Sequence, residues 1–167
     1  MTTKPLIRRA EVLDARSIHE AHMRSIRETC SAHYTPEEIT AWAGREFNET
    51  KRIDSIKNDF LWVVENQGTI EGFGHLILES EKDAYIEALY FCLSVIGKGV
   101  GHRMLKLMEE VARDKKNNTI TLNSTITSLP FYKIQGYREM GPQITVQING
   151  AGIRCHPMEK KLNTLKK

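Results

Sequence analysis

The spacing of apolar residues changes along the chain, from a helical period in the first third to a strand period after it. Residues 15–31 carry apolar side chains three and four positions apart on one face, which predicts a helix that Asp14 can cap. The segment 35–38, TPEE, predicts a second helix start, because Thr35 suits the capping position and Glu38 can complete a capping box. The helices expected here are 15–31, 36–44 and a shorter one at 48–57.

The period becomes that of strands from residue 60 onward. Two apolar runs, 60–66 and 70–79, surround the turn dipeptide Gln67-Gly68 and predict a hairpin. The next run, 84–91, alternates, so one face of that strand is expected to carry Tyr85, Glu87, Leu89 and Phe91. The other elements expected are a strand at 5–10, a helix at 100–116, a strand at 119–123, a helix at 128–135, and strands at 137–148 and 152–162 around Asn149-Gly150.

In chain order these elements read β-α-α-β-β-β-α-β-α-β-β, with 48–57 as an additional short helical piece. This order predicts an α+β (mixed α/β) fold, in which helices cover both faces of a single central, mixed but mostly antiparallel sheet. The helix at 100–116 separates the strands 84–91 and 119–123, which predicts one parallel crossover. The chain has 167 residues, the size of one domain, so 1–167 is expected to fold as a single unit.

Composition excludes several classes of function. The net charge of +3 is too small to indicate a nucleic-acid partner. No apolar run approaches the roughly 18–20 residues that span a bilayer, and the first residues lack the apolar region of a signal peptide. We therefore expect a cytoplasmic protein with neither a nucleic-acid nor a membrane partner.

The cysteines and histidines do not form a pattern of metal ligands. Cys30, Cys92 and Cys155 are far apart and odd in number, which favours reduced thiols over a disulfide framework. The six histidines form no HExxH and no finger-like spacing with cysteine. No metal is expected.

Residues 96–101 read IGKGVG and lead into the helix predicted at 100–116. A P-loop needs Lys and Ser/Thr after its last glycine, and the dinucleotide motif GxGxxG needs a third glycine where His102 stands, so neither fits. A pyrophosphate cradle does fit, because glycines allow close backbone approach and the free N–H groups of a helix start bind anions. The loop alone leaves a plain tight turn open as the alternative.

Two segments together resemble the signature of one family. LYFCLSVIGKGVGHRML (89–105) is similar to the acetyl-CoA-binding motif of the GNAT superfamily of acyl-CoA-dependent N-acetyltransferases, where a strand leads through Q/R-x-x-G-x-G/A into a long helix. LNSTITSLPFYKIQGY (122–137) resembles the second half of that signature at the expected spacing, and the element order resembles the family fold over nearly the whole chain. Ile96 departs from the usual Arg or Gln, so we expect the loop to bind through its backbone amides.

The resemblance implies transfer of an acetyl group from acetyl-CoA to a primary amine, on a small molecule or a peptide, by direct attack in a ternary complex. It implies that the CoA pyrophosphate binds residues 97–102 and that the pantetheine lies between the strands 84–91 and 119–123. The N–H of Phe91 is then expected to polarise the thioester carbonyl. The residues expected to bind the cofactor are Leu89, Tyr90, Phe91, Gly97, Lys98, Gly99, Val100, Gly101, His102, Asn123 and Tyr132.

Two residues are candidates for the proton transfers that the resemblance implies. Tyr132, in the FY of the second segment, is expected to protonate the leaving CoA thiolate, with packing over the cofactor as its alternative role. Glu87 is the candidate base for the amine, with a buried ion pair as the alternative. The candidate substrate-binding residues are His22, Tyr34, Trp42 and Glu87, although the first three residue types are also common in protein cores.

Two hypotheses from other classes stay open. One is a CoA-binding regulatory module without turnover, which Ile96 favours and which Tyr132 and Asn123 argue against. The other is a structural or partner-binding domain that uses the C-terminal hairpin. The sequence does not identify the acceptor amine, and it leaves open whether the protein is a monomer or a homodimer.

Overall fold

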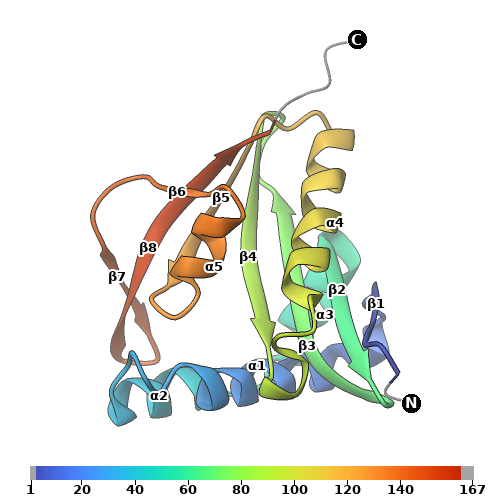
Figure 1. The fold of residues 1–167 in the computed structure, drawn as a ribbon. Coiled ribbons are helices and arrows are strands. Elements are labelled where there is room, and N and C mark those ends of the chain that lie inside the picture. The colour runs from blue at the N-terminus through green and yellow to red at the C-terminus, as the bar shows by residue number, and fades with distance from the viewer. Residues whose placement is uncertain (1–2, 163–167) are drawn as a thin grey trace.

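The computed structural model describes residues 3–162, and the strands within this range form one sheet (Figure 1). The strands are β1 (Leu6–Arg9), β2 (Phe60–Asn66), β3 (Thr69–Leu78), β4 (Asp83–Phe91), β5 (Thr119–Thr125), β6 (Arg138–Glu139), β7 (Ile144–Ile148) and β8 (Ala151–Lys161). Their order is β1-β2-β3-β4-β5-β8-β6, with β7 paired to β8. The pair β4–β5 is parallel and the other pairs are antiparallel, so the predicted mixed, mostly antiparallel sheet with one crossover is confirmed.

Helices cover both faces of this sheet. They are α1 (Ala15–Thr29), α2 (Pro36–Ala43), α3 (Glu49–Asn58), α4 (Val100–Asp114) and α5 (Leu129–Ile134), with short 3₁₀ turns η1 (Val12–Asp14) and η2 (Leu93–Val95). Met104 and Met108 of α4 and Tyr132 of α5 belong to the core on one face. Ile18 of α1 and Ile56 of α3 belong to the core on the other. The α+β layering expected from the sequence is therefore confirmed.

The predicted helix caps have different outcomes. The Thr35 hydroxyl accepts the Glu38 N–H at 3.1 Å and the Glu38 carboxylate accepts the Thr35 N–H at 2.9 Å, so the capping box is confirmed. Asp14 precedes α1, but its carboxylate accepts the Glu11 N–H and pairs with Arg8 at 2.8 Å instead of capping that helix. The Asp14 carboxylate therefore binds the Arg8 guanidinium and the Glu11 N–H rather than the free N–H groups at the start of α1.

The alternation of side chains along β4 is interrupted at Glu87. His75 of β3 pairs with Ala88, and the next residue, Leu76, pairs with Ile86. Glu87 is thus an extra residue without a partner in β3, which is a β-bulge. A bulge moves every later side chain to the opposite face from the one that strict alternation predicts.

The face predicted for the second half of β4 is consequently wrong. Leu89 and Phe91 pack on the α4 face. Tyr85, Ala88 and Tyr90 instead face the side that α1 and α3 cover. The hydrophobic pattern carries no sign of this shift, because β4 is apolar on both faces and reads as acceptable in either register.

β4 and β5 pair along only part of their length. The ladder runs from Asp83 with Thr119 to Ile86 with Leu122 and ends there. Beyond this point β4 stays paired with β3, whereas β5 stays paired with β8 as far as Thr125. Figure 1 shows the two strands diverging, with α4 on one side of the gap and α5 on the other.

Candidate active site

Two cavities meet in the gap between β4 and β5. The first, here named the loop cleft, has a volume of about 430 Å³ and is lined by the glycine loop, the end of β4 and the start of α5. The second, here named the polar cavity, has a volume of about 390 Å³ and is lined by α1, α3, β4, β5 and the β7–β8 hairpin. Tyr90 and Thr125 line both cavities, so the two spaces adjoin at these side chains.

The glycine loop presents a row of unpaired backbone amides to the loop cleft. Gly97 and Gly99 have φ angles of 81° and 78°, a left-handed conformation that favours glycine. No side chain caps α4, and the first amide of this segment that bonds to a described residue is Arg103 N–H, which donates to the Gly99 carbonyl. The amides of 97–102 therefore point free at the positive end of a helix, an arrangement that binds phosphate.

Side chains complete the loop cleft unevenly. Val100, Gly101 and His102 line it, and the His102 ring bonds the Gln135 side chain at 2.8 Å. Lys98 is exposed and does not belong to the lining of either cavity in the described part of the chain. A cofactor contact from the Lys98 side chain stays a prediction, whereas its backbone N–H is one of the unpaired amides of residues 97–102.

The end of β4 turns backbone donors toward the gap. The Cys92 N–H donates to the Glu71 carbonyl on β3 at 2.8 Å. Because N–H directions alternate along an antiparallel strand, the N–H of Phe91 and that of Leu89 point away from β3, toward β5. β5 does not pair with this part of β4, so both donors face the loop cleft.

Tyr132 forms the wall of the loop cleft on the α5 side. Its ring is 5% exposed and makes edge contacts with Phe131 and Tyr137. Its hydroxyl makes no hydrogen bond with another side chain or backbone group of residues 3–162. Burial, and to a smaller extent Tyr85, raises the pKa of the Tyr132 phenol well above its usual range, so the group is protonated at neutral pH.

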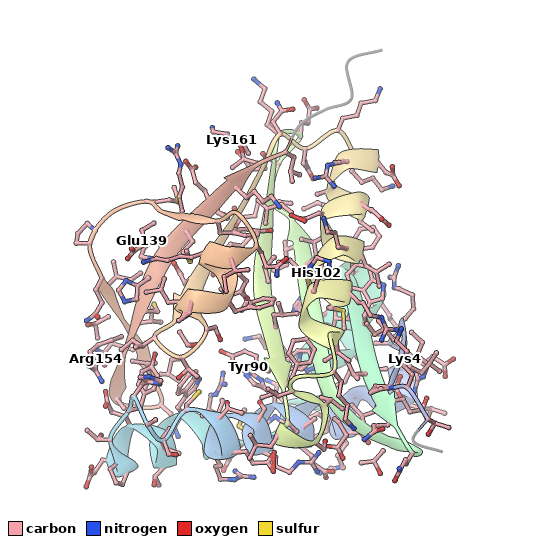
Figure 2. The ribbon with its side chains drawn as sticks, in the orientation of Figure 1. Lys4, Tyr90, His102, Glu139, Arg154 and Lys161 are labelled. Carbon is pink, nitrogen blue, oxygen red and sulfur yellow. The ribbon has the colours of Figure 1, made fainter. Side chains whose placement is uncertain are left out.

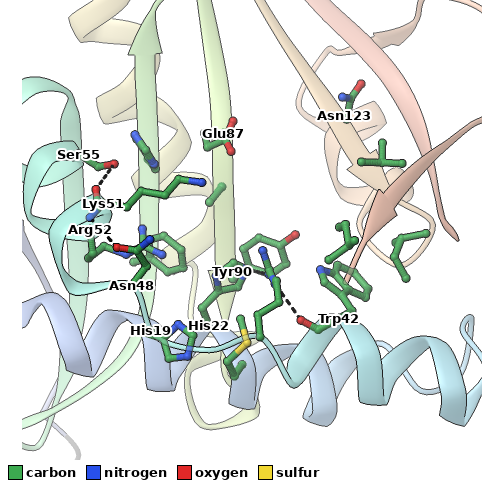
Figure 3. Close-up of a pocket in the computed structure, with 18 of the residues that line it drawn as sticks. His19, His22, Trp42, Asn48, Lys51, Arg52, Ser55, Glu87, Tyr90 and Asn123 are labelled. Carbon is green, nitrogen blue, oxygen red and sulfur yellow. Dashed lines mark hydrogen bonds between the residues drawn. The ribbon is translucent and has the colours of Figure 1, made fainter. Parts of the chain in front are cut away.

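Glu87 and Asn123 lie where β4 and β5 separate, and both line the polar cavity. Figure 3 shows Glu87 on β4 facing Asn123 on β5 across the opening. The Asn123 amide donates to the Tyr85 hydroxyl at 3.4 Å. Asn123 was expected among the cofactor-binding residues, but the structure places it in the polar cavity and not in the loop cleft.

The three candidate substrate-binding residues from the N-terminal helices are in different environments. His22 and Trp42 lie in the wall of the polar cavity, at 8% and 2% exposed. Burial, followed by the charges of Arg45 and Arg52, lowers the pKa of His22 well below its usual value, so its ring is neutral. The Tyr90 ring, labelled in Figure 2, packs against the His22 ring in a tilted arrangement with the ring centres 4.3 Å apart, and His22 does not line the loop cleft.

Tyr34 lies outside the lining of both cavities as described. Its hydroxyl donates to the Arg154 carbonyl at 2.6 Å and accepts the Ile126 N–H at 2.9 Å. It therefore joins β8 to the loop that follows β5. Because the Tyr34 hydroxyl both donates and accepts a hydrogen bond within the protein, a structural role is favoured over the predicted substrate contact.

Sequence reasoning missed the basic residues of the polar cavity. Arg45 follows the end of α2, and Lys51 and Arg52 lie in the first turns of α3. His75 also lines the cavity, and its ring bonds the Asp59 carboxylate at 2.8 Å. No sequence signal separates these residues from solvated surface charge, because only the packing of α3 against β2 and α1 turns them inward.

The described residues hold neither a membrane span nor a metal cluster. None of their helices is both long and apolar enough to cross a bilayer. No three His, Cys, Asp or Glu side chains among them come together as metal ligands. Cys30, Cys92 and Cys155 are all free and buried.

Comparisons with known proteins agree with this geometry. A family model described as an acetyltransferase (GNAT) domain matches residues 30–162. An uncharacterized N-acetyltransferase, YafP from Escherichia coli (strain K12), is 26% identical over 145 residues, which cover 87% of this chain and 88% of YafP.

Solved structures give the same fold. A GCN5-related N-acetyltransferase from Rhodopseudomonas palustris superposes with a TM-score of 0.83 at 23% identity, covering 97% of this chain and 98% of that one. The PaiA N-acetyltransferase of Thermoplasma acidophilum, solved in complex with coenzyme A, has a TM-score of 0.77 at 20% identity, covering 95% of this chain and 99% of that one. With a family model that matches most of its length, the chain belongs to the GNAT family and is an acyl-CoA-dependent N-acetyltransferase.

Proposed function

We propose that the protein transfers the acetyl group of acetyl-CoA to a primary amine that binds in the polar cavity, by direct attack and with Tyr132 as general acid. The observation that carries this proposal is that the two cavities adjoin at Tyr90 and Thr125, which line both of them. A thioester in the loop cleft and an amine in the polar cavity can meet there without a covalent enzyme intermediate. Holding both reactants in this way supplies much of the rate acceleration that such a reaction needs.

The loop cleft fits the donor. The free amides of 97–102 suit the pyrophosphate, and the unpaired edge of β4 suits the amide groups of pantetheine. The Phe91 N–H, turned toward the gap, is then a donor to the thioester oxygen as negative charge develops on it. The coenzyme A complex of the Thermoplasma relative supports this assignment.

The reaction has two proton transfers, and residues on opposite sides of the gap serve them. An alkyl amine with a pKa near 10.4 must lose a proton before it attacks, and Glu87 is the carboxylate at the mouth of the polar cavity. The leaving thiolate, with a thiol pKa of about 8.5, gains a proton, and the buried phenol of Tyr132 holds one at neutral pH. The amine nitrogen forms the new amide bond as the carbon–sulfur bond breaks, and CoA leaves as the thiol.

Release of free CoA thiol in the presence of an amine panel tests the proposal. The panel contains polyamines, amino acids, aminoglycosides, and peptides with free N-terminal or lysine amines, and mass spectrometry identifies the acetylated product. Amine-dependent thiol release with an N-acetyl product is the expected result. Acetyl-CoA binding without turnover of any amine would instead favour the regulatory module.

A further inference from the structure

The lining of the polar cavity holds one more cationic side chain than carboxylate side chains. The cations in its lining are Arg45, Lys51 and Arg52, and the carboxylates are Glu46 and Glu87. None of these five forms an ion pair within 4.0 Å with any residue of the described range 3–162. The cavity thus holds charged groups that are available to a ligand.

The Arg52 guanidinium has no polar partner among the described residues. It makes no hydrogen bond with another described residue and lies 5.1 Å from the centre of the Phe73 ring. Burial, followed by the charge of Arg45, lowers the pKa of Arg52. The charge of Glu87 offsets this effect in part, but no carboxylate forms an ion pair with the Arg52 guanidinium in the described range.

Arg45 holds a second guanidinium in the same cavity. Its Nε donates to the Trp42 carbonyl at 2.9 Å, and one terminal nitrogen lies 3.4 Å from the His22 ring. These contacts fix the plane of the group and leave its other terminal nitrogen open. Burial lowers the pKa of Arg45 as well. Burial lowers the pKa of His19, His22 and His75, so these rings add no further positive charge at neutral pH.

The charged residues come from different elements. Figure 3 shows Arg52 and Lys51 on α3, with the Lys51 side chain extending toward β4, whereas Glu87 lies on β4 toward the opening that faces Asn123. The amine has to lie at this opening, next to the loop cleft, in order to reach the thioester. A positive ammonium near Glu87 and a negative group near the arginines would match this distribution of charge.

We propose that the acceptor is a primary amine that also carries a carboxylate, as an amino acid does, and that Arg52 and Arg45 bind the carboxylate. This inference rests on the proposed acetyl transfer and names the class of its acceptor. The planar guanidinium matches two carboxylate oxygens, and the cavity of about 390 Å³ is of the size that holds a small molecule. The ring of Tyr90, which lines the cavity, gives the rest of the acceptor an apolar surface.

The test compares α-amino acids with their carboxamides and with amines that lack the group, for example phenylalanine, phenylalaninamide and phenethylamine. The expected result is a kcat/KM for the best amino acid at least about tenfold above that of its carboxamide. Arg52→Gln should lower the value for the amino acid about 10- to 100-fold and that for the carboxamide by a clearly smaller factor, since a neutral carbonyl binds a guanidinium more weakly. Lys57→Gln, which removes an exposed charge from the same helix outside the cavity, should change neither.

Equilibrium calorimetry of the same compounds with the CoA-bound protein separates the two levels of the proposal. An amino acid that binds to the wild type and binds more weakly to Arg52→Gln supports the carboxylate site. If in addition no amine is acetylated, only the transfer reaction is overturned. Equal affinity for acid and carboxamide, or acetylation that prefers phosphoethanolamine or the amines that lack a carboxylate, would overturn the carboxylate site and leave the transfer reaction standing. The affinity for acetyl-CoA and the melting temperature of each variant show that it is folded.

Discussion

The Phe131 ring lies against the backbone of Gly101, so close that a Cβ atom built on Gly101 would come within 3.2 Å of it. Gly101 belongs to the glycine loop at the start of α4, and Phe131 belongs to α5 on the other side of the loop cleft. The contact joins the two halves of the family signature across the cleft. The absence of a side chain at residue 101 therefore sets the distance between α4 and α5.

Replacing Gly101 with Val should lower the affinity for acetyl-CoA. The larger side chain meets Phe131 and pushes α5 away from the loop, so the dissociation constant should rise about tenfold or more. Titration calorimetry measures this change. Gly141→Val is the matched control, because a Cβ atom at that exposed glycine meets no atom within 4 Å. Equal affinity of the Gly101 variant and the control would show that the contact does not shape the site.

Ile96 gives an opportunity to strengthen the same site. It is 50% exposed in the lining of the loop cleft, where the family motif usually has Arg or Gln. Ile96→Arg should add a charge-assisted phosphate contact and tighten acetyl-CoA binding about threefold to tenfold at low ionic strength. Leu93→Arg adds the same charge on an exposed residue outside the cleft lining and controls for general attraction. A similar gain in acetyl-CoA affinity in both variants would show that the effect comes from general charge attraction and not from a specific phosphate contact.

The sequence predicts the parts of the site that depend on local backbone rules. The glycine loop, the capping box at Thr35 and Glu38, and the turn at Asn149-Gly150 each follow from residues adjacent in the chain. The positive φ values of 49° and 83° at Asn149 and Gly150 are those that this dipeptide favours. The loop cleft follows from the same kind of information, because a short motif builds most of it.

The polar cavity depends on features that sequence patterns do not record. The bulge at Glu87 sends Tyr85 and Tyr90 to the same side of β4, and no local residue pattern marks it. Arg45 and Arg52 look like surface charge until α3 packs against the sheet. The long-range packing of helices, rather than any motif, decides which charged side chains turn inward, so the acceptor site was less predictable than the donor site.

Tyr34→Phe distinguishes a structural role from the substrate contact that its sequence position suggested. The variant loses the bonds to the Arg154 carbonyl and the Ile126 N–H, so the free energy of unfolding should fall by about 1–3 kcal/mol. Urea unfolding measures this loss. The KM for the acceptor should stay the same, since Tyr34 is outside the polar cavity lining. A raised acceptor KM with unchanged stability would restore the substrate role.

Tyr132→Phe tests the general acid. The variant keeps the buried ring but has no proton to give the CoA thiolate, so kcat should fall about 100-fold or more while acetyl-CoA affinity stays within about twofold. Tyr137→Phe is the matched control, because that buried hydroxyl has no partner among the described residues and its loss should not lower kcat. Unchanged turnover in the Tyr132 variant would assign the residue to packing alone.

The neutral histidines of the polar cavity should make stability depend on pH. Burial lowers the pKa of His22 in the folded state below its value of about 6.5 in the unfolded chain. At pH values between these two pKa values the unfolded chain binds the extra proton, so stability is full above about pH 6.5 and falls as the pH decreases. His75 and His19 shift in the same direction and add to the effect.

The free energy of unfolding should therefore decrease between pH 7 and pH 5, by up to about 2 kcal/mol for the buried His22 and by less for the partly exposed His19. His22→Leu removes one of these groups and should make the decrease smaller, although the variant starts from a lower stability because Arg45 loses its contact. His33→Leu, at an exposed histidine, should leave the decrease as it is. Urea unfolding at a series of pH values measures all three proteins. If the free energy of unfolding depended on pH in the same way for wild type and His22→Leu, His22 would be protonated in the folded protein without cost. The positive potential that Arg45 and Arg52 create at His22 would then be weaker than their positions indicate.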